Sequence, residues 1–386
     1  MSLKSHFQLR PDIHFLNFGS FGATPKELTE DYRKWQDMLE YEPIQFMTVT
    51  GPQFLEVSRK ALGDYIGCHQ DDVVFTMNPS YAINIIAKSI DLKSGDEVLT
   101  TDLEYGAMDK TWNYYAGKKG FTYKRQPIRL PLQSKEDFIE QFWKGYTPKT
   151  KVIFISQITS STALIFPVKE ICERAKELGL LTIVDGAHVP GHIDLDLKTL
   201  KADIYTGACH KWMMTPKGCS FLYVKKVYQD QFDPLLISWG YDSAMPSHSR
   251  FLDYHQQQGT RDFSAFLTVP AAIEFMENHN WKKVSAGCRE LVRNNINRFS
   301  QLLSNEPLAP TTDEFYGQMA SFRIRSSQPL LLKRELYNTY KIEIPVMVHD
   351  DKTFIRYSIN AFNDQSDLDA LFEALVAISK EGVLLS

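Results

Sequence analysis

Short apolar runs alternate with helical patterns from about residue 54 to residue 224, and this alternation is the strongest constraint on the fold. Lys151–Ile155 and Leu181–Val184 are continuous apolar runs of strand length, typical of strands that are buried on both faces. Between them a helical stripe runs from Val168 to Leu178 and is followed by Gly179, a favoured residue just past a helix end. Such alternation predicts an α/β fold with a mostly parallel central sheet. The other elements expected in this region are a helix over Phe54–Tyr65 and strands at Val73–Thr76, Glu97–Thr100, Phe121–Tyr123 and Phe221–Val224.

The last third of the chain departs from this alternation. A long helical pattern covers Ala271–Leu302, strands are expected at Ala320–Ile324 and Phe354–Ser358, and a final helix is expected at Leu368–Leu385. Strands mixed irregularly with helices indicate a second, smaller α+β domain. We therefore expect a large domain over residues 17–265 and a small C-terminal domain over residues 266–386, to which residues 1–16 are added.

Length and composition set wide limits. The 386 residues are 43% hydrophobic, which suits a large core and two domains. A net charge of -4 gives no reason to expect a nucleic acid or a membrane as partner, and no apolar run approaches the roughly 18 residues of a membrane span. The start, MSLKSHFQLRPDIHF, lacks the apolar core of a signal peptide. The five cysteines show no paired spacing, which indicates free thiols in a reducing compartment, so we expect a cytoplasmic protein.

One lysine lies in an unusual setting, the stretch DIYTGACHKWMMTPKGCSFLYV over residues 203–224. Lys211 is surrounded by small and apolar residues and precedes a Pro-Lys-Gly turn and a strand. A lysine is rarely buried without a reason. The ordinary explanation is a side chain whose ammonium group reaches water, and for this lysine taken alone it is the better one.

A carboxylate lies at the end of a central strand, where the ligands of parallel sheets bind. Asp185 follows the strand Leu181–Val184 in LLTIVDGAHVPGH. Its side chain either caps the next turn or points into the ligand crevice, and the two readings are evenly matched at this point.

A helix start after the strand Val73–Thr76 could hold a phosphate. Asn78 and Pro79 are favoured residues for the first positions of a helix. The N–H groups of Ser80 and Tyr81, expected to be free, then form a cradle with the Ser80 hydroxyl. An ordinary capped helix explains the same residues. No G-x-G-x-x-G or G-x-x-x-x-G-K-[ST] motif supports a nucleotide site.

A metal site competes for the region around residue 185. Five possible ligands lie within twelve residues, namely Asp185, His188, His192, Asp194 and Asp196. The chain lacks H-E-x-x-H, and the spacing also fits a loop whose Asp and His residues cap turns. A metal-dependent hydrolase is therefore the alternative from a different class.

Taken together, three of these features match the needs of a pyridoxal phosphate enzyme. A lysine forms the covalent link to the cofactor aldehyde, which is the role that this combination assigns to Lys211. A carboxylate such as Asp185 keeps the pyridine nitrogen protonated, and a helix N-terminus holds the phosphate.

These residues also resemble the class V aminotransferase family of fold-type I pyridoxal phosphate enzymes, and within it the isopenicillin N epimerase-like branch. The resemblance covers nearly the whole chain and rests on six segments in family order. They are FLNFGSFGATP (15–25), DLEYGAMDKTW (102–112), VDGAHVPG (184–191), YTGACHKWMMTPKG (205–218), QGTRDFSAFLTVPAA (258–272) and IRYSINAFND (355–364).

The resemblance implies a role for each matched residue. It makes Lys211 the Schiff-base lysine, Asp185 the partner of the pyridine nitrogen and Arg356 the residue that binds the substrate carboxylate, a pairing that arginine suits. The remaining implied contacts are Tyr105 on the ring face, His188 and Thr159 near the ring hydroxyl, Ser80, Tyr81 and His210 at the phosphate, and Asn17 with the Gly19-Ser20 turn in the substrate pocket.

The resemblance further implies a homodimer, because Thr260 would reach the phosphate of the neighbouring subunit. The chain departs from the family pattern in three places. Ala208 stands where Asn or Ser is frequent, Phe362-Asn363 replaces the usual Tyr-Asn, and the phosphate loop carries Pro79 and Tyr81 where small residues are common.

The reaction is the open question. We expect an epimerase or racemase acting at Cα of an amino acid or short peptide, with a C–S β-lyase on cysteine derivatives or an aminotransferase as alternatives. Each needs Lys211 to carry a proton. Cysteine desulfurase activity is disfavoured, because residues 289–386 contain no cysteine that could act as the mobile thiol used by desulfurases of this family.

Overall fold

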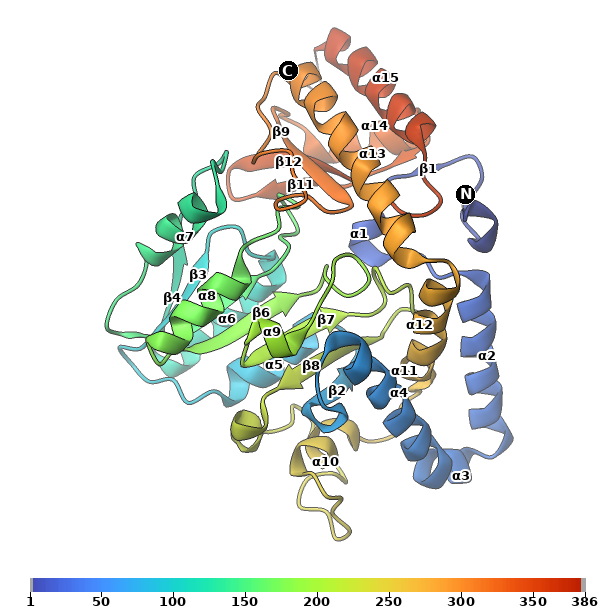
Figure 1. The fold of residues 1–386 in the computed structure, drawn as a ribbon, viewed down its shortest axis with the longest axis vertical. Helices are drawn as coiled ribbons and strands as arrows, with labels where there is room; N and C mark the ends of the chain where they lie inside the picture. Colours follow the sequence, from blue (N-terminus) through green and yellow to red (C-terminus); the bar gives the residue numbers. More distant parts are fainter. Residues whose placement is uncertain (1–2, 383–386) are drawn as a thin grey trace.

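The computed structural model describes residues 3–382 and contains a large and a small β-sheet with helices packed around them (Figure 1). The large sheet has seven strands in the order β2-β8-β7-β6-β5-β3-β4. In chain order these strands are β2 (Val73–Thr76), β3 (Glu97–Thr101), β4 (Thr122–Gln126), β5 (Thr150–Ser156), β6 (Leu181–Gly186), β7 (Ile204–Ala208) and β8 (Ser220–Val224).

Most neighbours in this sheet are parallel. The pairs β3–β4, β3–β5, β5–β6 and β6–β7 are parallel, whereas β8 runs antiparallel to both β7 and β2. The predicted α/β fold with a mostly parallel central sheet is thus confirmed. All the strands expected in this region are present, although β4 begins one residue later than expected and runs three residues further. The strand β7 lies in the stretch that precedes Lys211 and was not anticipated.

Helices cover both faces of the large sheet (Figure 1). Because side chains alternate across a strand, Ile153 and Ile155 of β5 join a core cluster with α7 and α8, while Val152 and Phe154 join a second cluster with α5 and α6. The helices of this part are α2 (Lys26–Tyr41), α3 (Pro43–Gln45), α4 (Gly51–Ile66), α5 (Pro79–Ser89), α6 (Gly106–Lys119), α7 (Lys135–Trp143), α8 (Val168–Glu177), α9 (Leu197–Leu200), α10 (Arg250–Gln256), α11 (Ser264–Leu267) and α12 (Val269–Asn278). Short turns of other helix types lie at Phe46–Thr50, Gln70–Asp72 and Lys226–Gln231.

The small sheet is antiparallel, with the order β11-β12-β9. Its strands are β9 (Met319–Ile324), β11 (Val346–His349) and β12 (Lys352–Ser358), and the helices α13 (Trp281–Leu302), α14 (Pro329–Asn338) and α15 (Gln365–Glu381) belong to the same part of the chain (Figure 1). The N-terminal segment joins this part, because β1 (His14–Phe15) pairs in parallel with β10 (Ile342–Glu343). A 3₁₀ turn at Lys4–His6 precedes β1, and α1 (Phe18–Phe21) follows it.

Two predicted helices differ from those observed. The pattern over Ala271–Leu302 forms two helices rather than one, because the chain turns at Asn280 with φ 50°, in the left-handed region. The final helix begins at Gln365 with a capping box on Asp364, and the expected end at residues 383–385 lies outside the described residues. The expected boundary after residue 265 falls within α11, and the division into two domains stays a prediction.

No helix that the structure describes is long and apolar enough to cross a membrane.

Candidate active site

The ends of two neighbouring parallel strands bring Asp185 and Lys211 together. Asp185 is the penultimate residue of β6 and pairs in register with Thr206 of β7. Lys211 follows the end of β7 by three residues, and its Nζ lies 3.3 Å from Nε2 of His188. Since both strands run the same way, their carboxyl ends meet at one edge of the sheet, where ligands of such sheets bind.

Lys211 is half-buried, but its amine has lost most of its contact with water. Burial and, to a smaller extent, the positive charge of Arg356 lower the pKa of Lys211 to about 7, although Asp185 opposes both. A lysine in this state is largely neutral just above pH 7 and can act as a nucleophile or a base. The structure therefore contradicts the ordinary explanation for this lysine, in which the ammonium group reaches water.

Asp185 is 3% exposed and carries a raised pKa, mainly because of burial. The N–H of Ala187, which donates to Asp185 Oδ1 at 2.9 Å, and the charge of Lys211 both favour the ionised carboxylate. Asp185 thus caps its turn and also lies beside Lys211, so the two explanations offered by the sequence hold together.

Arg356 approaches the same place from the small sheet. It lies on β12, is 1% exposed, and donates from Nη1 to the carbonyl of Ser160 at 2.6 Å and from Nη2 to Ser20 Oγ at 3.3 Å. Its Nε is buried with no hydrogen-bond partner among the described residues. Burial lowers the pKa of Arg356 to about 10, while Tyr105 raises it. A guanidinium with an unused donor in a dry site is suited to receive a carboxylate.

The segment around Asn17 is pressed against both Lys211 and Arg356. Ser20 Oγ donates to Asn17 Oδ1 at 2.5 Å. Gly22 has φ 68°, and a Cβ there would lie 2.4 Å from the carbonyl oxygen of His210 and 2.8 Å from that of Lys211. The close approach of these backbones therefore requires glycine.

The predicted helix start after β2 is present as the N-terminus of α5. Asn78 caps the helix, and its Oδ1 accepts the N–H of Tyr81 at 2.8 Å. The N–H of Tyr81 is therefore not free, contrary to our expectation, whereas that of Ser80 lies in the first turn, where a helix supplies no acceptor. The Tyr81 hydroxyl donates to Gln258 Oε1 at 2.9 Å, and Gln258 Nε2 is buried with no partner among the described residues. An unused amide donor beside a helix N-terminus fits an anion.

His210 is fixed by a backbone carbonyl. Its Nδ1 lies 2.7 Å from the carbonyl oxygen of Cys219, and because a carbonyl only accepts, Nδ1 carries the proton. Burial lowers the pKa of His210 to about 4. The neutral ring leaves Nε2 as an acceptor, so His210 can donate to a phosphate only after gaining a second proton.

The other residues expected near the site lie in different environments. Tyr105 precedes α6 and is 49% exposed, and Thr260 is exposed. Thr159 is fully buried, with Oγ1 2.5 Å from that of Thr162. Of the positions that depart from the family pattern, Ala208 ends β7 as a buried residue and Phe362 is buried, while the neighbouring Asn363 donates to the carbonyl of Phe15 at 3.1 Å.

Sequence reasoning missed Glu104, which is 1% exposed. Its oxygens accept from Thr101 Oγ1 at 2.8 Å, from the N–H of Ser156 at 3.0 Å and from Ser156 Oγ at 2.5 Å. Burial raises the pKa of Glu104 to about 8 despite these bonds, and Asp185 adds to the rise. Ser156 also pairs in register with Asp185, so the two carboxyl groups are neighbours. The one available signal was a carboxylate shortly after the predicted strand Glu97–Thr100, next to Tyr105.

The metal site considered from the sequence does not form. Among residues 3–382 no group of three or more His, Cys, Asp and Glu side chains is placed to hold a metal ion. Both ring nitrogens of His192 are occupied, Nδ1 by the carbonyl of His188 at 2.8 Å and Nε2 by the N–H of Gln318 at 2.5 Å. Asp196 instead caps α9 by accepting from the N–H of Lys198.

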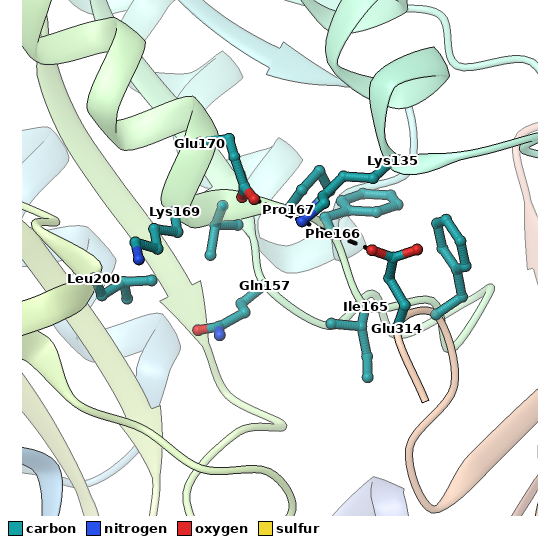
Figure 2. A pocket seen from close by; sticks show the side chains of 11 residues that line it. Lys135, Gln157, Ile165, Phe166, Pro167, Lys169, Glu170, Leu200 and Glu314 are labelled. Carbon is teal, nitrogen blue, oxygen red and sulfur yellow. Dashed lines mark hydrogen bonds and ion pairs between the residues drawn. The ribbon is translucent and has the colours of Figure 1, made fainter. Parts of the chain in front are cut away.

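A surface pocket of about 170 Å³ lies away from these residues (Figure 2). It is lined by parts of α7 and α8 and closed by ion pairs from Lys135 to Glu170 at 2.7 Å and to Glu314 at 3.7 Å. Gln157 lines this pocket and donates its N–H to the carbonyl of Asp185 at 2.9 Å. None of the residues predicted for the site lines this pocket.

Comparison with known proteins gives consistent results. The family model described as Aminotransferase class-V matches residues 43–371. Isopenicillin N epimerase of Amycolatopsis lactamdurans is 32% identical over 98% of this chain and 98% of its own length, and that of Streptomyces clavuligerus is 30% identical over 97% and 96%. A probable chloroplastic L-cysteine desulfhydrase of Arabidopsis thaliana is 24% identical over 96% of this chain and 84% of its own length.

Solved structures share the fold. The apo structure of a cysteine desulfurase from Thermococcus onnurineus NA1 matches with a TM-score of 0.83 and 21% identity, over 98% of both chains. A C-DES mutant with glycine covalently linked to the PLP cofactor matches with a TM-score of 0.82 and 19% identity, over 97% of this chain and 99% of that one.

Proposed function

Because the chain belongs to the aminotransferase class-V family, whose cofactor is pyridoxal 5′-phosphate, we propose that it is an epimerase or racemase acting at Cα of an amino acid or short peptide. The observation that carries this proposal is the desolvated amine of Lys211, with a pKa of about 7, between His188 and the buried Arg356. Such an amine can take and return a proton near neutral pH, which epimerisation requires.

The residues around Lys211 fit the cofactor. The unused donor of Gln258 and the N–H of Ser80 at the capped start of α5 suit its phosphate, which His210 can also bind once it has gained a second proton. Asp185 would hold a proton on the pyridine nitrogen, Tyr105 would cover the ring face, and His188 and Thr159 would face the ring hydroxyl. When bound, the cofactor supplies an electron-withdrawing ring that makes the Cα–H of the substrate acidic.

The remaining steps belong to side chains of this chain. Arg356 binds the substrate carboxylate with its unused Nε donor, and Asn17 with Ser20 borders that position. Lys211 Nζ takes the proton from Cα while neutral, and inversion then requires a proton to reach Cα from the opposite face. The dry surroundings that lower the pKa of Lys211 allow both the neutral and the charged amine at neutral pH.

Epimerisation is preferred to the alternatives on similarity. The isopenicillin N epimerases are 32% and 30% identical over nearly the full length, whereas the cysteine desulfhydrase is 24% identical. A C–S β-lyase acting on cysteine derivatives is the second candidate, since it needs no mobile thiol and relatives named L-cysteine desulfhydrase match. An aminotransferase is a third.

We further propose a cytoplasmic homodimer with the site at the subunit interface. The exposed Thr260 would reach the phosphate of the neighbouring subunit. The preceding segment carries exposed apolar side chains, including Ile237, Trp239 and Met245, at 61%, 86% and 87% exposure, and such patches are typical of interfaces. Five free cysteines suit a reducing compartment.

The deciding experiment follows Cα–H by NMR in D₂O with the cofactor-loaded enzyme, a panel of amino acids and no keto-acid acceptor. Deuterium at Cα together with the opposite stereoisomer supports the epimerase. Pyruvate and ammonia from cysteine derivatives, without any enantiomer, would make the enzyme a β-lyase. A protein that takes up no cofactor and shows no yellow colour would contradict the whole proposal.

A further inference from the structure

Trp212, directly after Lys211, faces the ring of His188. The indole Nε1 of Trp212 lies 3.4 Å from Nδ1 of His188. An indole N–H can only donate, so Nδ1 of His188 must be the acceptor and carries no proton. The other ring nitrogen, Nε2, is the one that lies 3.3 Å from Lys211 Nζ.

The His188 ring is neutral. It is 3% exposed, and burial, helped by the charges of Lys211 and Arg356, lowers the pKa of His188 well below its usual range. A neutral imidazole has one proton, and with Nδ1 accepting, that proton is on Nε2. His188 therefore presents an N–H, not a lone pair, toward Lys211.

A second histidine supports the orientation of Trp212. The ring of His192 stacks on that of Trp212 with centroids 4.0 Å apart and an interplanar angle of 27°. Nε2 of His192 accepts the N–H of Gln318, so its proton lies on Nδ1 and is donated to the carbonyl of His188. Burial lowers the pKa of His192 to about 3, which keeps this ring neutral as well.

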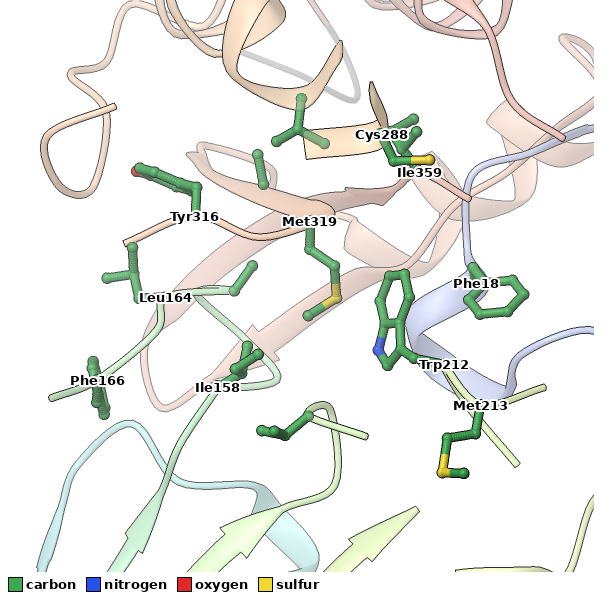
Figure 3. Packing of buried hydrophobic residues seen from close by; sticks show 14 of the residues in the cluster. Phe18, Ile158, Leu164, Phe166, Trp212, Met213, Cys288, Tyr316, Met319 and Ile359 are labelled. Carbon is green, nitrogen blue, oxygen red and sulfur yellow. The ribbon is translucent and has the colours of Figure 1, made fainter. Parts of the chain in front are cut away.

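Packing fixes the indole on its other side. Trp212 is fully buried in the cluster between the two sheets that Figure 3 shows, with Phe18 at a ring distance of 5.1 Å. Each hydrogen bond thus points toward the site. Gln318, next to β9, donates to the ring of His192, His192 donates to the backbone carbonyl of His188, and the His188 ring donates to Lys211. Trp212 fixes the orientation of the His188 ring.

We propose that Trp212 is a positioning residue that holds His188 in the Nε2–H form, so that the group facing Lys211 is always a hydrogen-bond donor. The contacts within the protein determine which nitrogen of each histidine ring carries the proton, without any contribution from the cofactor. A second consequence rests on the proposed function: once Lys211 is linked to the cofactor, the same N–H is available to the oxygen of the cofactor's ring hydroxyl and favours its ionised form.

The first test is ¹⁵N NMR of the cofactor-free protein labelled at histidine, with the signals of His188 and His192 identified by their loss in His188→Gln and His192→Gln. We expect opposite forms in one spectrum, with His188 protonated on Nε2 and His192 on Nδ1. A His188 ring protonated on Nδ1, or a mixture of both forms, overturns the inference. This outcome is independent of the cofactor, and failure to bind pyridoxal phosphate would instead overturn the proposed function.

Trp212→Phe keeps the ring but removes the donor. We expect the Nδ1–H form of His188 to appear in this variant. The matched control is Trp281→Phe, because Trp281 is also buried and donates its indole N–H to the carbonyl of Gly191, in the same segment, at 2.8 Å. The control should leave His188 in a single form. If His188 keeps that form in both variants, Trp212 has no positioning role.

The cofactor provides an independent measurement. In absorbance titrations with pyridoxal phosphate we expect Trp212→Phe to weaken binding roughly 5-fold, the loss typical of one hydrogen bond, and to shift the pH at which the visible band changes. Trp281→Phe should do neither. His188→Gln, which retains an N–H donor, should bind the cofactor better than His188→Leu, and equal binding by these two variants contradicts a donor role for His188.

Discussion

The candidate site has two parts that differ in their exposure to water. The floor consists of Glu104, Asp185 and Lys211. Burial is the main cause of the pKa shifts of all three side chains. The residues proposed for the rim, Tyr105 and, from a second subunit, Thr260, are exposed. Because all three floor residues belong to one chain, they can determine the protonation states at the site without a second subunit. The rim loses its contact with water only when the cofactor, a substrate or a second subunit covers it. Substitutions of its residues should therefore change the affinity for these partners.

The largest expected effect concerns the floor. Lys211→Ala should lower deuterium exchange at Cα by roughly 10⁴-fold, because no other group at the site combines an amine with a pKa near 7. Lys198→Ala is the control, since Lys198 is exposed on α9. Exchange that survives in Lys211→Ala would show that another group carries the proton.

The pH dependence of cofactor uptake tests the same lysine without any turnover. A pKa lowered to about 7 leaves the amine neutral above pH 7. Stopped-flow absorbance should therefore show uptake by the apo protein slowing about tenfold for each pH unit below 7 and levelling off above it. A rate that keeps rising toward pH 10 would mean that Lys211 is ordinarily solvated.

Arg356 joins the floor to the small sheet and should matter for binding. Arg356→Lys removes the forked donor, and we expect KM to rise roughly 10- to 100-fold with a smaller change in kcat, as for the loss of a charge-assisted hydrogen bond. Arg323→Lys on β9 is the control, because Arg323 is exposed and opposite Phe354 of β12. Steady-state kinetics with the best substrate from the NMR panel measures both. A loss confined to kcat would contradict carboxylate binding.

Glu104 should affect stability in a defined pH window. Its folded pKa of about 8 lies above the usual value of 4.5 for a glutamate, so the folded protein binds more protons between these two pH values. Stability should then fall as pH rises through this window, by at most about 1.4 kcal/mol per pH unit for one proton. Urea unfolding of Glu104→Gln should show a flatter dependence, whereas the exposed Glu140→Gln should match the parent protein. Equal slopes in the parent and Glu104→Gln would place the Glu104 carboxylate in a wetter environment.

The smallest effect is expected at the rim. Thr260→Ala should weaken cofactor binding roughly 5-fold by removing one hydrogen bond, with little change in the pH dependence of uptake. Absorbance titration above and below the concentration at which the dimer dissociates, found by sedimentation, separates contact with the partner from contact within one chain. An effect as large as that of Lys211→Ala would remove the distinction between floor and rim.

Local patterns predicted the framework because they reflect local physics. The apolar run Leu181–Val184 and the stop signal at Gly179 identified β6 and the end of α8, and with them the position of Asp185. The strand β7 was missed because Thr206-Gly207-Ala208 lacks the bulky apolar residues that mark a strand. It forms because β6 and β8 supply hydrogen bonds on both sides.

The sequence by itself determined the fold class, the family and the residue types at the site, because helix caps, strand ends and motif spacings are properties of neighbouring residues. Only the tertiary structure decided the protonation states. Glu104 is buried beside Asp185, Arg356 comes from the other sheet to lower the pKa of Lys211, and Trp212 donates to His188 across 24 residues of chain. Desolvation and Coulomb interactions depend on distance in space, and distances between remote segments exist only after folding.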